Sequence, residues 1–148
     1  MSIEANKALA RRYFEELLNE GNLAVADEIL APNIIVHSSF QIMIQGVENV
    51  KQSMAGFRAA FPDQHFTIED EISEGDKVVF RYVYRGTHQG EFRGIAPTGK
   101  QVTIAGIAIY QITRERPHGR IEEAWIAGDN LGLMQQLGAV PAPGQGGS

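Results

Sequence analysis

Cysteine is absent from the 148 residues of the chain. Its absence excludes disulfide bonds, thiolate metal ligands and a cysteine nucleophile. An excess of positive charge is missing too: thirteen Lys and Arg residues stand against eighteen Asp and Glu residues, which gives a formal net charge of −5. A surface of that sign repels phosphate backbones and anionic lipids, so we expect neither nucleic acid nor a membrane as a partner.

Long apolar runs are also missing. No stretch approaches the roughly 18 consecutive apolar residues that a membrane-spanning helix needs. The first 22 residues mix Glu, Lys and Arg throughout, so they lack the uninterrupted apolar centre of a secretory signal. Together with the lack of cysteine, this pattern favours a cytoplasmic location.

The length predicts one domain, because a domain typically has roughly 100–200 residues. We expect this domain to span residues 1–139. Residues 140–148 contain two prolines and three glycines, which predicts a flexible C-terminal tail.

The order of the expected elements indicates the fold class. Apolar residues at three- and four-residue spacing predict helices over residues 3–20, 23–30 and 47–61, with a strand over 33–40 between the last two. Alternating patterns then predict strands over residues 66–72, 77–87, 102–113 and 120–126, followed by a short helix over 130–137. Helices followed by a run of strands predict an α+β fold. We expect a strongly bent antiparallel sheet, a cone-shaped barrel, packed on about three helices from the N-terminal half.

Strand parity indicates which side chains face the helices, because neighbouring residues point to opposite faces. In strand 77–87, the face that carries Phe80, Tyr82 and Tyr84 is aromatic, and we expect it to lie inward. In strand 102–113 both faces are mostly apolar, whereas a strand with one face exposed to water usually carries polar residues on that face. The second face, with Ile107 and Ile109, predicts a homodimer contact through the sheet, or cover by a loop or the C-terminal tail.

Two small residues, Gly106 and Ala108, lie on the inward face of strand 102–113 between large ones. They leave volume for a ligand cavity or for an aromatic ring from a helix. A filled core is the other interpretation of the same aromatic pattern. The side chains expected to line a cavity are Phe57, Phe61, Phe80, Tyr82, Tyr84 and Tyr110.

No P-loop, dinucleotide-binding fingerprint, HExxH helix or nucleophile elbow is present. His37 and His88 are the best catalytic candidates, because both lie where strands can open toward the wide end of a bent sheet. Each also fits a structural hydrogen-bonding role. Neither has a second histidine at ligand spacing, so we expect no metal site.

Carboxylates near the last strand supply further candidates. Asp129 lies between a strand and a helix, where it can act as a general acid/base or cap the helix. Glu122 and Glu123 are adjacent in one strand, so one of them points inward unless a bulge intervenes. An inward glutamate would have a raised pKa and could act as an acid/base.

Four segments occur in an order and at separations typical of one family: residues 86–92 (GTHQGEF), 94–100 (GIAPTGK), 119–125 (GRIEEAW) and 129–138 (DNLGLMQQLG). They resemble the SnoaL-like polyketide cyclases, also called ester cyclases. The resemblance implies the cone-shaped α+β fold of the nuclear-transport-factor-two-like superfamily. It also implies a dimer formed back to back through the sheets, and activity without a metal or cofactor.

In the family that the chain resembles, an aspartate in the last strand acts as acid/base in the aldol closure of a polyketide ester. Its position corresponds to Ile126 here, and that of an inward polar pair corresponds to Gly106 and Ala108. The resemblance therefore implies the scaffold without its known acid/base, because isoleucine cannot transfer a proton. We also expect Trp125 and Ile126 to contact the ligand.

Two functions follow as hypotheses. In the first, the cone binds a small hydrophobic molecule, polyketide-like or a related carbonyl compound. There it catalyses a cofactor-free cyclisation or isomerisation with His88, His37, Asp129 or Glu122. In the second, the chain is a non-catalytic carrier of an apolar ligand. If the chain is an enzyme, we expect a titratable group deep in the cavity. If it is a carrier, we expect all ionisable groups to lie at the rim of the cavity.

Overall fold

The computed structural model describes residues 2–38, 43–114 and 119–141. The helical segments are α1 (Ile3–Arg12), η1 (Tyr13–Asn19), η2 (Leu23–Val25), α2 (Ala26–Ile29), α3 (Val47–Ala60) and α4 (Asn130–Gln136). The strands are β1 (Leu30–Ser38), β2 (Ile44–Gln45), β3 (His65–Glu74), β4 (Lys77–Thr87), β5 (Gln101–Ile112) and β6 (Ile121–Gly128). The predicted α+β class is confirmed, and β4 has the bounds that the sequence predicts.

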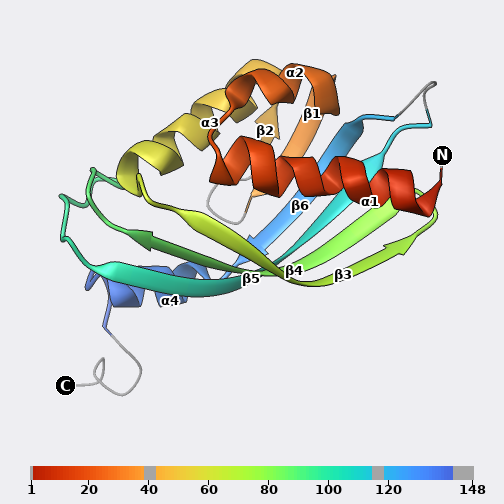
Figure 1. Cartoon of the computed structure of the whole chain (residues 1–148). Helices are drawn as coiled ribbons and strands as arrows, with labels where there is room; N and C mark the ends of the chain where they lie inside the picture. The colour runs from red at the N-terminus through yellow and green to blue at the C-terminus, as the bar shows by residue number, and fades with distance from the viewer. Residues whose placement is uncertain (1, 39–42, 115–118, 142–148) are drawn as a thin grey trace.

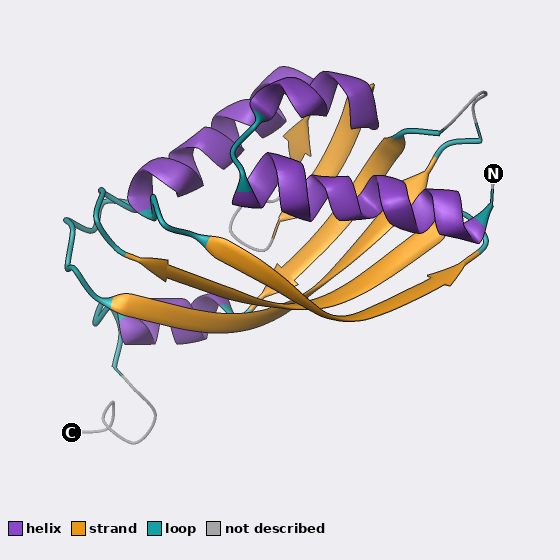
Figure 2. Cartoon of the chain, in the orientation of Figure 1, coloured by secondary structure: helices purple, strands orange, loops and turns teal. Residues whose placement is uncertain are grey.

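The molecule has a helical layer over one face of a strongly bent sheet. Helices α1, α2 and α3 lie on the concave side, and α4 lies on the opposite side (Figure 1; Figure 2). The strand order is β2-β1-β6-β5-β4-β3, so β2 and β3 are edges and the sheet does not close on itself. The cone is therefore open along one side. We call the helix-covered side the inner face and the other side the outer face.

The sheet is mixed, whereas we expected antiparallel pairing throughout. Strands β3, β4, β5 and β6 form an antiparallel meander, but β1 runs parallel to β6. The sequence pattern predicts pairing between strands that follow one another in hairpins. It does not predict this pairing between distant parts of the chain. The pair matters for the site, because it places Val36 of β1 beside Ala124 of β6.

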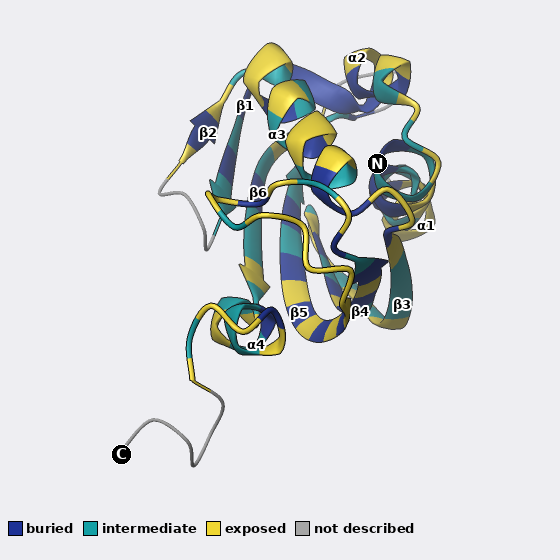
Figure 3. Cartoon of the chain, turned by 90° about the vertical axis from the view of Figure 1, so that its left-hand side faces the viewer, coloured by how far each residue is buried: buried dark blue, intermediate teal, exposed yellow. Residues whose placement is uncertain are grey.

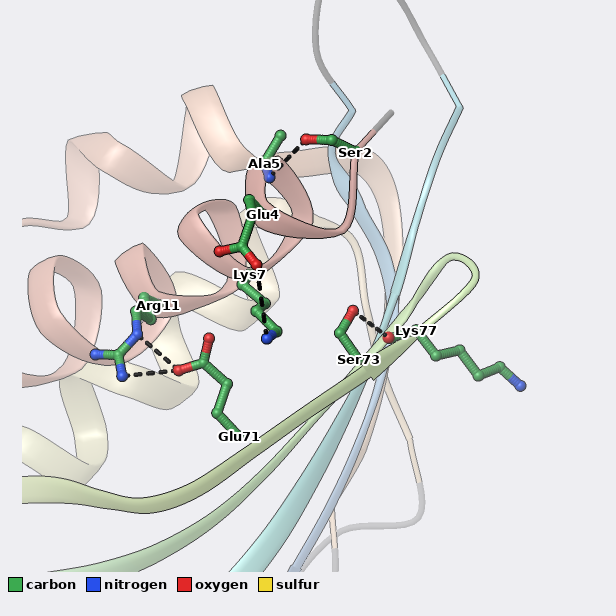
Figure 4. A network of polar contacts seen from close by, with 8 residues as sticks. All are labelled: Ser2, Glu4, Ala5, Lys7, Arg11, Glu71, Ser73 and Lys77. Carbon is green, nitrogen blue, oxygen red and sulfur yellow. Dashed lines mark hydrogen bonds and ion pairs between the residues drawn. The ribbon is translucent and has the colours of Figure 1, made fainter.

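Ser2 caps the first helix, because its hydroxyl accepts a hydrogen bond from the backbone N–H of Ala5 at 3.0 Å. The helix continues into η1, a π-helical stretch with buried Tyr13 and Phe14. Arg11 forms an ion pair with Glu71 of β3, in which Nε lies 2.7 Å from Oε2 (Figure 4). This contact holds the helix over the β3 edge of the sheet.

The inner face carries the core, as parity predicts. On β4, the side chains of Val78, Phe80, Tyr82 and Tyr84 are buried, and the even-numbered residues of β5 are buried as well. The alternation of buried and exposed residues shows as stripes along β5 in Figure 3. Phe14 contacts this face: its ring centroid lies 5.2 Å from that of Phe80 and 5.6 Å from that of Tyr82.

The outer face is covered only in part among the described residues. Leu133 of α4 is fully buried, and the side-chain amide of Gln136 makes two hydrogen bonds of 2.8 Å with the backbone of Thr103. A helix thus covers the start of β5, whereas the two interpretations of this face were a homodimer contact and cover by a loop or the tail. Farther along, Ile107 of β5 is 48% exposed and Ile72 of β3 is 64% exposed.

Some expectations fall on residues that lie outside the described ones: the end of strand 33–40 and most of the tail. The division into a domain of residues 1–139 and a tail stays a prediction. No described helix is long and apolar enough to cross a membrane. The cytoplasmic location also stays a prediction.

Candidate ligand-binding site

A cavity of about 130 Å³ lies between the helices and the inner face of the sheet. Its walls come from η1, β1, β2, α3, the start of β3, the inner face of the meander and the first residue of α4. The lining residues are Tyr13, Phe14, Leu18, Val36, Ser38, Ile44, Val50, Ser53, Met54, Phe57, Gln64, Phe66, Tyr82, Tyr84, Ile104, Tyr110, Ile126, Gly128 and Asn130.

The cavity wall is apolar and aromatic, with a few neutral polar groups. Apart from four tyrosines, the polar side chains are those of Ser38, Ser53, Gln64 and Asn130. Among the described residues, no Asp, Glu, His, Lys or Arg lines the cavity. Within the same residues, no group of three or more His, Asp or Glu side chains is placed to hold a metal ion. The lining therefore offers hydrogen bonds and apolar contact, but no charge.

Burial keeps the four tyrosines of the wall protonated. It raises the pKa of Tyr82 to about 12 and raises those of Tyr13, Tyr84 and Tyr110 further. The cause is the same in each case, because a phenolate loses more hydration than a phenol when it is buried. At neutral pH these hydroxyls are hydrogen-bond donors and cannot act as bases.

One tyrosine hydroxyl already has a protein partner. The hydroxyl of Tyr84 donates to Oε1 of Gln64 at 3.1 Å, and Nε2 of Gln64 donates to the carbonyl of Leu18 at 3.3 Å. These two hydrogen bonds link β4 to η1 across the wall of the cavity. Gln64 is only 5% exposed, so its hydrogen bonds satisfy an amide that is costly to bury unpaired.

Gly106 provides room for a ring and not for a ligand. A Cβ at this position would lie 2.3 Å from the Tyr82 hydroxyl, which no real contact allows. Tyr82 is the register partner of Gly106 on the neighbouring strand, so its side chain lies across the glycine. The ring that fills this volume therefore comes from the sheet, whereas we expected a helix or a ligand. Neither Gly106 nor Ala108 lines the cavity.

His37 lies on the outer face, so the expectation that it reaches the cavity is wrong. Residues alternate along β1, and Val36 takes the inward position next to it. Nε2 of His37 lies 2.6 Å from Oε2 of Glu123, and its ring stacks on Trp125 with centroids 5.5 Å apart. Trp125 is therefore also an outer-face residue and does not line the cavity.

His88 is fully buried but does not line the cavity either. Its Nδ1 accepts the backbone N–H of Thr98 at 3.2 Å and lies 3.0 Å from the Thr98 hydroxyl. Phe61 contacts both His88 and Tyr84, with centroid distances of 5.5 and 5.9 Å. The imidazole thus lies behind this layer of rings, where it holds the loop of residues 88–98 together.

The expected inward glutamate does not exist, because a bulge intervenes. The register of β5 and β6 pairs Ile112 with Ile121 but Gln111 with Glu123, so Glu122 is an extra residue. After the bulge, Ala124 and Ile126 face inward. Glu122 is exposed and Glu123 lies on the outer face.

Asp129 caps a helix, which is one of its two expected roles. Its carboxylate accepts the backbone N–H of Gly132 at 2.8 Å at the start of α4. The residue is exposed and does not line the cavity, whereas its neighbour Asn130 does.

The predicted ligand-contacting residues divide into two groups. Those that line the cavity are Phe57, Tyr82, Tyr84, Tyr110 and Ile126. Phe61 and Phe80 are fully buried in the surrounding core, so the interior combines a cavity with a filled region. The structure brings none of the four predicted catalytic residues into the cavity.

Comparisons with known proteins agree with this architecture. The family model described as SnoaL-like polyketide cyclase matches residues 8–137. The chain belongs to the SnoaL-like polyketide cyclase family. A candidate polyketide cyclase from Acidithiobacillus ferrooxidans is 30% identical, with a TM-score of 0.78 over 94% of this chain and 99% of that one. A search of curated proteins found no match.

Two further solved structures are similar to this SnoaL-like chain. IdmH from Streptomyces antibioticus, a candidate polyketide cyclase, is 28% identical, with a TM-score of 0.76 over 90% of this chain and 98% of that one. A SnoaL-like protein from Jannaschia sp. CCS1 is 24% identical, with a TM-score of 0.86 over 95% and 97%. At that identity, the latter comparison shows the fold alone.

Ile126, the position at which the resemblance leads us to expect the family's acid/base aspartate, lines the cavity. A carboxylate at this point would face the cavity, and isoleucine supplies only apolar contact.

The cavity residues that the sequence analysis did not select come mainly from the helices and from β1. Tyr13, Phe14 and Leu18 belong to the apolar face of the first helix, and Val50 and Met54 belong to the apolar stripe of α3. Their periodicity predicts that they are buried. It does not distinguish a residue that faces a void from one that fills the core.

Proposed function

We propose that this chain binds a small, uncharged and largely apolar molecule in its cavity, without acid/base chemistry by the lining. One observation supports this above all: the described wall is aromatic and apolar, and its only ionisable groups are tyrosines that stay protonated. A largely apolar pocket with a few placed polar groups is the usual form of a small-molecule site. A charged ligand would lose its hydration there without gaining a partner.

The volume limits the size of the ligand. The cavity of about 130 Å³ is close to the engineered apolar cavity of about 150 Å³ that binds benzene. It is below the range of about 300–1,000 Å³ typical of sites for larger ligands. The ligand we propose is therefore about the size of a single substituted ring.

Native mass spectrometry tests the proposal on the purified full chain with a ring-sized probe such as acetophenone. Ser53→Phe places a ring in the cavity from α3, and Gln52→Phe adds the same ring at the neighbouring exposed position. We expect one probe molecule to bind the parent chain and Gln52→Phe, and binding to Ser53→Phe to fall at least tenfold. Equal binding to both variants would place the ligand elsewhere.

A second candidate function is the cofactor-free cyclisation or isomerisation of the bound molecule. Membership of the SnoaL-like polyketide cyclase family favours it. It requires a base that the described cavity wall lacks, so the base would have to come from the ligand or from outside the lining. Recovery of a chemically changed ligand with the parent chain, but not with Ser53→Phe, would support this function over simple binding.

The outer face supports a further proposal, a homodimer formed through the sheet. Ile72 and Ile107 are exposed there, beside the partly buried Ile109 and Trp125. Light scattering over a range of protein concentrations tests it. We expect Ile107→Lys to yield monomers, and Ile3→Lys, at a similarly exposed position on α1, to leave the dimer intact. A monomeric parent chain would exclude the dimer.

A further inference from the structure

A buried histidine lies at the start of the loop of residues 88–100, which joins β4 to β5. His88 is fully buried, and its Nε2 atom has no hydrogen-bond partner among the described residues. Buried polar atoms in folded proteins are normally paired, so this nitrogen needs an explanation. Because His88 does not line the cavity, the proposed binding function does not supply one.

The backbone of the loop closes around the imidazole. The N–H of His88 donates to the carbonyl of Lys100 at 2.9 Å, and the N–H of Gly99 donates to the carbonyl of His88 at 2.8 Å. The side chain adds a further hydrogen bond, because Nδ1 accepts the backbone N–H of Thr98 at 3.2 Å. Thr98, Gly99 and Lys100 are themselves exposed, so a single layer of chain separates this side of the imidazole from solvent.

The closed loop also supports the cavity wall from behind. The N–H of Gly90 donates to the carbonyl of Ala60 at the end of α3, at 3.1 Å. The ring centroid of Phe92 lies 5.3 Å from that of Phe57 and 5.5 Å from that of Phe61. Phe57 lines the cavity. If the loop opens, a residue of the cavity wall therefore loses part of its packing.

The hydrogen bond from Thr98 selects the form of the imidazole that fits the closed loop. A nitrogen that accepts an N–H carries no proton, so neutral His88 holds its proton on Nε2. A second proton would go to Nδ1, where it would face the backbone N–H of Thr98. Two donors form no hydrogen bond, and a buried charge without a partner is costly. The Thr98 hydroxyl, 3.0 Å from Nδ1, can rotate to suit either form, so the backbone N–H decides.

The charged groups of the surrounding segments do not pair with the imidazole. Asp63 accepts the backbone N–H and the hydroxyl of Thr87, both at 2.7 Å. These hydrogen bonds lower the pKa of Asp63, so its charge stays constant between pH 5 and 7.5. Arg58 of α3 donates to the carbonyl of Leu18. The remaining charged residues, all exposed, are Arg85, Glu91, Arg93 and Lys100. Within the described chain, Nδ1 of His88 faces Thr98 and Nε2 has no hydrogen-bond partner.

We propose that His88 is an acid-sensitive latch of the loop of residues 88–100. The neutral imidazole holds the loop closed, and protonation releases the loop together with Phe92. Histidine is the side chain that ordinarily changes its charge between pH 5 and 8. The closed loop binds fewer protons than the open loop, so its stability falls as the pH falls. This inference concerns the loop and goes beyond the proposed binding function.

NMR on the full chain between pH 7.5 and pH 5 tests the latch. We expect the ¹⁵N shifts to place the proton of neutral His88 on Nε2. Hydrogen exchange reports local opening as a loss of amide protection. The protection factors of the Thr98 and Gly99 amides should fall at least tenfold at pH 5, with the same midpoint as the imidazole signal. The protection factor of Ala108, on the central strand β5, should stay constant, and the NOE between Phe92 and Phe57 should weaken.

Two asparagine variants assign the effect to one histidine. In His88→Asn, Oδ1 is as many bonds from the backbone as Nδ1, so it can accept the N–H of Thr98 but cannot take up a proton. His65→Asn removes an exposed histidine at the start of β3. We expect the loss of protection at pH 5 to persist in His65→Asn and to be absent in His88→Asn.

Several results would overturn the latch. They are a proton on Nδ1 at pH 7.5, protection of Thr98 that does not depend on pH, an equal loss at Ala108, or the same loss in His88→Asn. If His88→Asn does not fold, the midpoints in the parent chain still decide, because a loop that opens while His88 is neutral contradicts the proposal. None of these measurements uses a ligand, so their outcome is separate from that of the proposed function.

Discussion

The two faces of one sheet differ in the chemistry they carry. The inner face meets the helices around a cavity whose described wall holds no charge. The outer face carries the pair of His37 and Glu123, 2.6 Å apart, beside Trp125. Residues suited to acid/base catalysis are thus present, but on the side away from the cavity. Strand orientation, rather than residue type, decides which of them can meet a ligand in the cone.

A single bulge determines this division on β6. The extra residue Glu122 lets both Ile121 and Ala124 face inward, and it turns Glu123 outward. Bulges often redirect side chains beside functional sites. Here the result is that Ile126 reaches the cavity wall and no glutamate does.

The largest expected difference between the faces is in stability. Phe80 on the inner face is fully buried outside the cavity wall, whereas Ile107 on the outer face is 48% exposed. Phe80→Ala should lower the free energy of unfolding by about 3–5 kcal/mol, because it leaves a cavity in the core. Ile107→Ala should change it by less than about 0.5 kcal/mol in a dilute sample. Denaturant unfolding measures both.

The same two variants also test whether the outer face is covered in solution. If the loss of unfolding free energy in Ile107→Ala grows with protein concentration, this face is buried against a second chain. If Ile107→Ala lowers the free energy of unfolding as much as Phe80→Ala does at every protein concentration, the division into a buried inner face and an exposed outer face is contradicted.

The next contrast lies within the cavity wall. Tyr84→Phe leaves Oε1 of Gln64 buried without its donor, so it should lower the free energy of unfolding by about 1–3 kcal/mol. Tyr110→Phe removes a hydroxyl that has no hydrogen-bond partner among the described residues, so it should be neutral or stabilising in the ligand-free protein. Thermal unfolding of the two variants distinguishes them. Equal losses would mean that the Tyr110 hydroxyl is paired in solution.

More of the fold than of the site could be predicted from the sequence. Alternation along β4 and β5 predicts the inner face correctly, because a two-residue period depends only on local backbone geometry. The parallel pairing of β1 with β6 could not be predicted in this way, since it joins distant segments. The two-residue strand β2 is too short to show any period.

The site depends on details that periodicity does not contain. One inserted residue at Glu122 reverses the expected face of the glutamates. At Gly106, a small residue leaves space, but only the structure shows that Tyr82 fills it. The expectation that Ile126 takes the place of the family's aspartate rests on a resemblance, and the structure places Ile126 in the cavity wall.

The smallest expected effect concerns α4, the described helix on the outer side. Asp129 accepts the backbone N–H of Gly132, so Asp129→Ala should cost about 1 kcal/mol, whereas Asp129→Asn should cost only a few tenths because asparagine caps nearly as well. Neither variant should change the affinity for acetophenone, because the carboxylate does not line the cavity. A loss of binding or turnover in Asp129→Asn, with stability retained, would mean that a charge on the outer side influences the cavity and that the two faces are not chemically separate.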